Sequence, residues 1–168
     1  VNGSEFTARC EAVCGAKVEI VSGEEEAVLS YLGASDGGKC GMIDIGGGST
    51  EFTLGDDARI IGAVSLQMGA VRMNAQNPLF SKEAYDATVL QCRRLIRRDA
   101  PMLLAAEKRD YWVGVGGTMT TLGAMERAIP LFDPETCEGM TISLERVAAW
   151  GERLARISVA ERGQITGL

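Results

Sequence analysis

The sequence predicts an α/β domain built on a mixed β-sheet that is flanked by helices. Three stretches at residues 41–45, 51–54 and 59–67 have strand-like patterns and are joined by tight turns, so we expect them to pair antiparallel. A fourth strand is predicted at residues 111–115, after a long helical segment. From residue 40 onward the predicted order is therefore strand, strand, strand, helix, strand, helix, helix.

The helices are predicted from the helical spacing of apolar residues and from capping residues. The longest follows Ser81 and continues to about Arg98, and the last runs from Ser143 to about Ile157. Residues 130–139 are predicted to be a loop. Shorter elements are predicted at residues 5–13 (helix), 17–21 (strand), 22–32 (helix), 69–74 (helix) and 120–127 (helix).

Length and composition narrow the class of protein. A chain of 168 residues suffices for one domain with its own core, or for one domain and a fragment of another. The net charge of −6 and the pI near 4.8 argue against nucleic acid or an anionic membrane as a partner, because such partners usually select basic surfaces. The chain contains no apolar run long enough to span a bilayer.

The side chains that carry redox and acid–base chemistry are restricted as well. The five cysteines are scattered and lack the paired spacing of a zinc site, so we expect reduced structural thiols, which suit the cytoplasm. Because the chain has no histidine, any catalysis would use carboxylates, hydroxyls, backbone groups and a metal ion.

The strongest functional signal is the stretch Asp44-Ile-Gly-Gly-Gly-Ser-Thr-Glu51, which connects two predicted strands. Three successive glycines let the backbone lie against an anion with its N–H groups turned inward, whereas a plain hairpin needs only two special residues. Asp44 would be placed to hold a divalent cation, as hard oxygen ligands hold Mg²⁺. The residues predicted to bind phosphate are Gly46, Gly47, Gly48, Ser49 and Thr50.

A second glycine loop, Gly114-Val-Gly-Gly-Thr118, also follows a predicted strand and opens a helix. Free N–H groups and the helix dipole at such a position favour anions or ribose hydroxyls. The loop lacks the third glycine of a dinucleotide-binding fingerprint, and Gly-Thr also occurs as an ordinary helix cap. The second loop indicates an anion site mainly because the first glycine loop lies in the same domain.

The stretch Ser22-Gly-Glu-Glu-Glu combines a structural signal with a chemical one. Ser22 and Glu25 fit a capping box, which leaves Glu26 as the better candidate for chemistry, although acidic residues also stabilise a helix start without further function. Among basic residues, Arg72 is the most plausible substrate contact, because it lies near the first glycine loop in the sequence. The arginines within residues 93–98 fit a solvated helix face better than a polyanion site.

Three antiparallel strands followed by a helix and a strand resemble the ribonuclease-H-like core of actin-type ATPases. The chain from about residue 5 to residue 168 resembles, more specifically, the exopolyphosphatase/guanosine pentaphosphate phosphohydrolase (Ppx/GppA) family. The stretches that match this family's motifs, in the family's order, are residues 21–27, 32–33, 43–51, 66–72 and 114–122.

This resemblance implies a lobe of the actin-like ATPase superfamily. Residues 1–36 would be the end of a first actin-like lobe with the interlobe helix, and residues 37–168 would be the second, ribonuclease-H-like lobe. The family's first lobe begins with an Asp-Leu-Gly-Ser-Asn-Ser-like loop, the other half of its phosphate clamp, and this chain has no such segment. We therefore expect a fragment with poor activity by itself.

The resemblance also implies a function. It points to an Mg²⁺-dependent hydrolase that releases terminal phosphate from inorganic polyphosphate or guanosine pentaphosphate, and it allows for a homodimer. Glu26 matches the family's catalytic glutamate and Asp44 its metal-binding residue. By analogy with actin-like folds, Gly116, Gly117 and Thr118 would line the same cleft. Glu138 stands where family members often have histidine, so no histidine contribution is expected at that position.

Two other functions stay open on sequence. One is a guanosine tetraphosphate- or nucleotide-binding regulatory module without significant hydrolysis. The other is a lobe of an actin-like sugar or acetate kinase, although the glutamate-rich start of the helix at residues 22–32 argues against it. The sequence does not separate polyphosphate from guanosine pentaphosphate as substrate.

Overall fold

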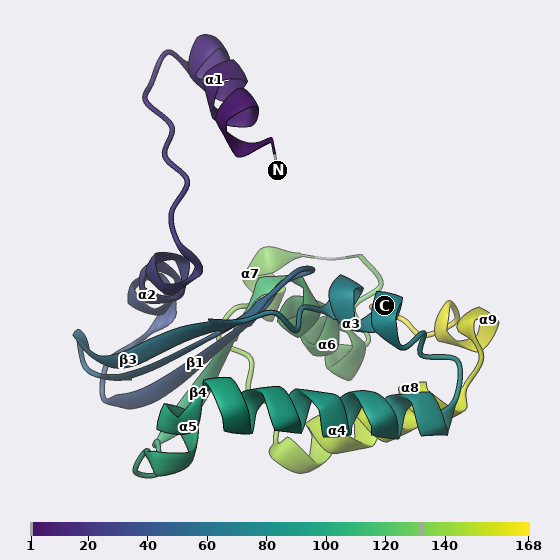
Figure 1. The fold of residues 1–168 in the computed structure, drawn as a ribbon. Helices are drawn as coiled ribbons and strands as arrows, with labels where there is room; N and C mark the ends of the chain where they lie inside the picture. Colours follow the sequence, from purple (N-terminus) through teal and green to yellow (C-terminus); the bar gives the residue numbers. More distant parts are fainter. Residues whose placement is uncertain (1, 132) are drawn as a thin grey trace.

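A four-stranded mixed sheet forms the centre of the structure (Figure 1), a computed structural model that describes residues 2–131 and 133–168. The strands are β1 (Lys39–Ile45), β2 (Thr50–Asp56), β3 (Arg59–Leu66) and β4 (Tyr111–Val115). Their order is β3-β2-β1-β4, with β1, β2 and β3 in an antiparallel meander and β4 parallel to β1. The four strands predicted after residue 40 and the predicted mixed sheet are confirmed.

One face of the sheet is covered by α2 (Gly23–Ala34), which packs across β1, β2 and β3. Tyr31 of this helix is fully buried and forms an apolar cluster with Cys40 and Met42 of β1. The Tyr31 hydroxyl donates a hydrogen bond to the Asp57 carbonyl at 3.0 Å. Because α2 is held by both apolar packing and hydrogen bonds, the side chains on its inner face have a defined position above the sheet.

The opposite face carries α4 (Lys82–Asp99) and α5 (Pro101–Ala105), below the sheet in Figure 1. Cys92 and Ile96 lie on the apolar side predicted for α4, and they pack against the main core cluster. The buried members of this cluster are Phe52, Leu66, Met68, Met73 and Ala100. The core therefore lies between the sheet and the long helix that the sequence predicts.

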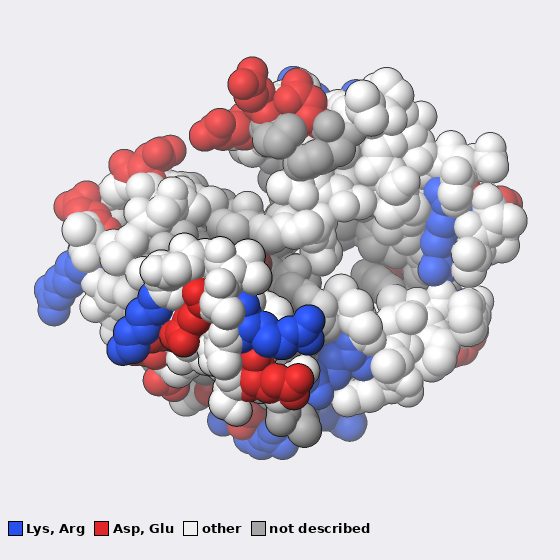
Figure 2. Space-filling model, turned by 90° about the horizontal axis from the view of Figure 1, so that it is seen from above, with Lys and Arg blue, Asp and Glu red and all other residues white. Residues whose placement is uncertain are grey.

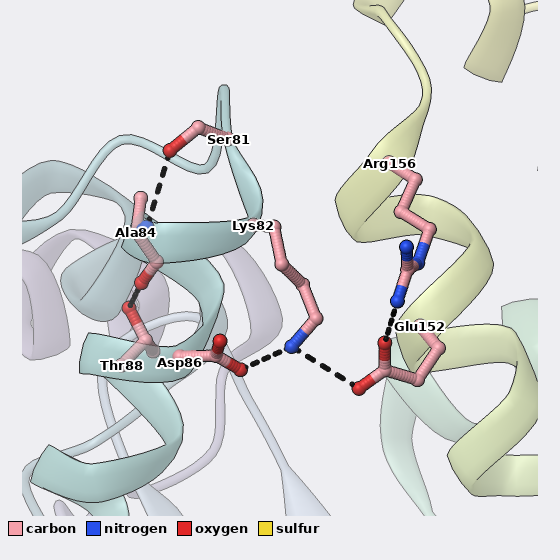
Figure 3. Close-up of polar contacts among 7 residues, drawn as sticks. All are labelled: Ser81, Lys82, Ala84, Asp86, Thr88, Glu152 and Arg156. Atoms are coloured by element: carbon pink, nitrogen blue, oxygen red, sulfur yellow. Dashed lines mark hydrogen bonds and ion pairs between the residues drawn. The ribbon is translucent and has the colours of Figure 1, made fainter.

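The helix α4 is joined by charged side chains to α8 (Leu144–Arg156), as Figure 3 shows. Lys82, which follows the predicted N-cap Ser81, pairs with Asp86 on its own helix and with Glu152 of α8, the latter at 3.3 Å. Exposed pairs of this kind each contribute at most about 1 kcal/mol. They fix how the two helices meet more than they stabilise the fold.

Three local predictions need correction. Residues 17–21 are extended but form no strand, because no other strand lies beside them in the described part of the chain to complete a hydrogen-bond ladder. The loop predicted at residues 130–139 contains a short helix, for which the Asp133 carboxylate accepts hydrogen bonds from the Glu135 N–H and the Thr136 hydroxyl. The helix predicted from residue 120 begins at residue 116.

The remaining helices are α1 (Gly3–Cys14), α3 (Ala70–Gln76), α6 (Gly116–Arg127), α7 (Pro134–Cys137) and α9 (Val159–Arg162).

On the face seen in Figure 2, acidic and basic side chains are mixed in the lower part, acidic side chains gather at the upper edge, and no broad basic patch is visible. An anion at this face would therefore have to be held by local groups and not by a broad basic field. α1 projects away from the sheet (Figure 1), and none of its residues is buried. None of the described helices combines the length and apolarity needed to cross a membrane.

A matched pair of glycine substitutions tests the packing of α2 on the sheet. Gly55 lies at a register shift between β2 and β3, and a Cβ there would run into the buried Tyr31 ring and hydroxyl. We expect Gly55→Ala to lower the free energy of unfolding by about 1–3 kcal/mol, the usual cost of overpacking. Gly33→Ala on α2 meets open space and should raise it by about 0.5–1 kcal/mol, because alanine favours a helix. Urea unfolding of both variants measures the difference, and equal effects would contradict the packing.

Candidate active site

Two carboxylates face each other where the first glycine loop joins its strands. Asp44 and Glu51 are partners in the antiparallel ladder of β1 and β2, so both side chains leave the same face of the sheet. This is the face covered by α2, because the Ser30 hydroxyl of that helix donates to Asp44 Oδ2 at 3.4 Å. Glu51 is only 2% exposed, and its Oε1 accepts a hydrogen bond from the Ser65 hydroxyl at 2.6 Å. The sequence analysis noted Glu51 within its motif but assigned it no role.

The acidic pair carries an electrostatic cost. Burial of Asp44, and then the negative charge of Glu51, raise the pKa of the Asp44 carboxyl above its ordinary value, and the hydrogen bond from Ser30 offsets only part of this. A divalent cation beside both carboxylates would remove the repulsion.

The donor set fits magnesium. Among the described residues no group of three or more His, Cys, Asp or Glu side chains could hold a metal ion. Mg²⁺ does not require such a cluster, because it is usually bound by one or two carboxylates, with waters and substrate phosphates completing its shell. Asp44 and Glu51 would be the residues that hold it.

The carbonyl groups of the first glycine loop are all turned toward α3. Those of Gly46, Gly47 and Gly48 accept hydrogen bonds at 2.7–3.2 Å, and the donors are the N–H groups of Gly69, Ala70 and Arg72 and the Nε of Arg72. The N–H groups of Gly47 and Gly48 have no acceptor within the described residues. Because the carbonyls are engaged on one side, these N–H groups are available to an anion.

The three polar residues predicted near this loop have different positions. Ser49 accepts a hydrogen bond from the Gly46 N–H through its carbonyl, which closes the turn at 3.1 Å. Thr50 is 2% exposed, and its hydroxyl donates to the Met68 carbonyl, so its side chain supports the loop from below. Arg72 is exposed and uses its Nε on the loop, which leaves its terminal guanidinium nitrogens outside that bond.

Gly69 is a site residue that the sequence analysis missed. A Cβ at this position would lie 2.5 Å from backbone atoms of Gly47 and Gly48, so only glycine allows α3 to reach the loop carbonyls. The signal was present in the sequence as a glycine between a strand and a helix. Its partner, the glycine loop, lies twenty residues earlier in the chain, and only the fold brings the two together.

The second glycine loop lies against the same carboxylate. β4 pairs with β1 so that Val115 is the partner of Asp44, and a Cβ on the following Gly116, whose φ is +85°, would run into Asp44 Oδ1. The Thr118 hydroxyl donates to the Ile45 carbonyl at 3.0 Å, while Gly117 meets open space. The two predicted loops therefore meet at one end of the sheet, on either side of Asp44.

Two of the three glutamates at the start of α2, Glu25 and Glu26, have different roles because of the helix geometry. Hydrogen bonds from the Ser22 backbone N–H, and then from its hydroxyl, lower the pKa of Glu25, which completes the predicted capping box. Glu26 is exposed and has no capping role. It lies one turn before Ser30, and residues four apart share a helix face, so Glu26 is on the side of α2 that borders Asp44.

Two cavities of about 720 and 700 Å³ lie elsewhere. The first is between the outer side of α2 and β3, and the second is between the other sheet face and the helices α6 to α8. Neither is lined by residues 46–50 or 116–118.

The sheet order, with the two glycine loops at one end of the sheet, defines a lobe of the ribonuclease-H-like, actin-like ATPase fold, which confirms the predicted fold class. Within that fold, the chain belongs to the Ppx/GppA phosphatase family, which it matches over residues 1–168.

Individual relatives agree with this assignment. The chain is 37% identical over 130 residues to exopolyphosphatase 2 of Mycobacterium tuberculosis, covering 73% of this chain and 40% of the relative. The crystal structure of an exopolyphosphatase-like protein superimposes with a TM-score of 0.84 at 28% identity, covering 98% of this chain and 56% of that one. The Aquifex aeolicus PPX-GPPA enzyme shares the fold with a TM-score of 0.79 at 24% identity, over 99% of this chain and 56% of that one. The chain thus spans about half the length of these relatives.

The raised pKa of Asp44 gives a testable pH dependence. A carboxyl whose pKa is higher in the folded state destabilises the fold when ionised, and the penalty disappears as pH falls through that pKa. Without metal, Asp44→Asn should therefore have a higher thermal midpoint than the wild type at neutral pH, and the two midpoints should converge in acid.

Thermal unfolding in EDTA across pH measures this effect. The exposed Asp110→Asn serves as the matched control and should shift stability by no more than about 0.5 kcal/mol. A wild type that is as stable as Asp44→Asn at neutral pH would show that Asp44 is not strained by its surroundings.

Proposed function

We propose that the natural protein is an Mg²⁺-dependent phosphoanhydride hydrolase that releases terminal phosphate from inorganic polyphosphate. The observation that carries the proposal is the meeting of two glycine loops beside the acidic pair Asp44 and Glu51. The similarity to an exopolyphosphatase over 73% of the chain supports polyphosphate as the substrate. The five free thiols support a reducing, cytoplasmic location.

Binding of the substrate rests on the loops. The free N–H groups of Gly47 and Gly48 donate to the oxygens of a phosphate group, which a protein of net charge −6 cannot attract through its overall field. Gly116, Gly117 and Thr118 line the other side of the same site, and Arg72 adds positive charge at its edge. Asp44 and Glu51 would hold Mg²⁺, which would supply charge neutralisation on the phosphate oxygens.

The chemical step needs a base for water. Glu26 takes a proton from a water molecule whose oxygen forms a bond to the terminal phosphorus, in line with the bridging P–O bond. That bond breaks, and the shortened chain leaves with the electron pair on its bridging oxygen. Direct attack by water is preferred, because the two loops contain no lysine or cysteine that would serve as a covalent nucleophile.

The test is phosphate release by the natural full-length protein with polyphosphate and with guanosine pentaphosphate, each with and without Mg²⁺. We expect Mg²⁺-dependent release from polyphosphate. Release from guanosine pentaphosphate and not from polyphosphate would identify the nucleotide as the substrate. Tight binding of guanosine tetraphosphate without any release would instead favour a regulatory module.

Glu26 and Glu25 should give opposite profiles on substitution. If Glu26 is the base, Glu26→Gln lowers the rate by roughly 10²–10⁴-fold with little change in substrate binding or thermal midpoint, since only proton acceptance is lost. Glu25→Gln weakens the capping box and should cost about 1 kcal/mol or less of stability while the rate is retained.

Steady-state phosphate release and thermal unfolding of the two variants, measured side by side, separate the roles. A rate loss at Glu25 with a fully active Glu26→Gln would exchange the assignments and remove Glu26 as the base.

A further inference from the structure

We propose that Ser65 is a positioning residue that orients the carboxylate of Glu51 toward the metal and sets the distance between this carboxylate and α2. The inference rests on the proposed function for its catalytic meaning. Ser65 itself lies on β3, a strand that supplies none of the residues discussed above for phosphate or base.

The first contact joins Ser65 to Glu51. The two residues are partners in the β2–β3 ladder, and the Ser65 hydroxyl donates to Glu51 Oε1 at 2.6 Å. A hydrogen bond to an ionised carboxylate is shorter and stronger than one between neutral groups. Because Glu51 is only 2% exposed, its carboxylate has few other ways to be held in one orientation.

The second oxygen of Glu51 is left free by this bond. Oε2 has no hydrogen-bond partner among the described residues. Every fully buried side-chain oxygen in these residues does have a partner, so Oε2 is not fully buried. Oε2 is therefore the part of Glu51 that reaches open space, next to its ladder partner Asp44. Ser65 thus determines which oxygen of an almost buried carboxylate is available to a cation.

The third contact joins Ser65 to the start of α2. A Cβ on Gly23 would lie 2.6 Å from both Cβ and Oγ of Ser65, so the helix backbone rests directly on the serine. One turn further along, the same helix carries Glu26 and then Ser30, which donates to Asp44. One side chain on β3 therefore contacts both the proposed metal ligand Glu51 and the helix that carries the proposed base.

A matched control separates this role from ordinary packing. Thr53 is fully buried on the neighbouring strand β2, and its hydroxyl donates to the Ala27 carbonyl of α2 at 2.9 Å and not to either carboxylate of the acidic pair. Ser65→Ala and Thr53→Val each remove one hydroxyl beneath the same helix, a half-buried one and a fully buried one. Both should lower the thermal midpoint, but only Ser65→Ala should affect the metal.

The first measurement is the affinity for Mn²⁺, which serves as the probe for the Mg²⁺ site. Binding is monitored by electron paramagnetic resonance in the full-length protein without substrate. We expect Ser65→Ala to weaken Mn²⁺ binding by about 10–100-fold, as loss of a partner behind a metal ligand usually does. Thr53→Val should bind Mn²⁺ as the wild type does. Equal Mn²⁺ affinity in the two variants would overturn the inference.

The second measurement uses Gly23→Ala, which lifts α2 but keeps the hydroxyl of Ser65. In Gly23→Ala, the fold-loss of kcat for phosphate release should be larger than the fold-loss of Mn²⁺ affinity. In Ser65→Ala, high Mg²⁺ should restore part of the rate, and the KM for polyphosphate should be unchanged. A Gly23→Ala variant with wild-type kcat would overturn the link to α2.

These readouts also separate the inference from the proposed function. Weakened Mn²⁺ binding in Ser65→Ala, with no phosphate release even by the wild type, would support the positioning role and reject the hydrolase. An active wild type with unaltered Mn²⁺ binding in Ser65→Ala would support the hydrolase and reject the positioning role.

Discussion

The register between β1 and β2 is the constraint on which the site depends. It places Asp44 opposite Glu51, and it leaves residues 46–49 as the connection, so that the glycines have to turn within a few residues. A slip of one residue would move every side chain of one strand to the other face and separate the two carboxylates. The parallel pairing of β4 with β1 then brings Gly116 against Asp44 from the other side.

Backbone chemistry and like charge oppose each other at this end of the sheet. The loop is prepared for an anion because α3 engages its carbonyls, and Gly69 permits the close approach that this requires. The acidic pair beside it repels anions, and burial together with the negative charge of Glu51 raises the pKa of Asp44. A metal ion held by the two carboxylates would reconcile these opposing effects, and the hydroxyls of Ser30 and Ser65 donate hydrogen bonds to the carboxylates.

Much of the fold follows from local rules that can be read in the sequence. The strands were predictable because apolar alternation and tight turns are local patterns, and the helices of residues 22–32 and 81–98 because their caps lie within four residues of the groups they satisfy. The same holds for the capping role of Glu25, whereas the glycine loops as anion sites stay a prediction. The strand expected at residues 17–21 failed, because a strand depends on a partner and not only on its own pattern.

The sequence by itself determined the elements, the two loops and the family motifs, since each depends on residues close together in the chain. Only the tertiary structure decided that both loops meet at Asp44, that Thr50 turns its hydroxyl inward, and that Gly69, Glu51 and Ser65 belong to the site. Glu51 and Ser65 are 14 residues apart in the sequence, and Asp44 and Gly116 are 72 residues apart. Their contacts arise from strand register and from the packing of α2 and α3 on the sheet, which no local pattern in the sequence encodes.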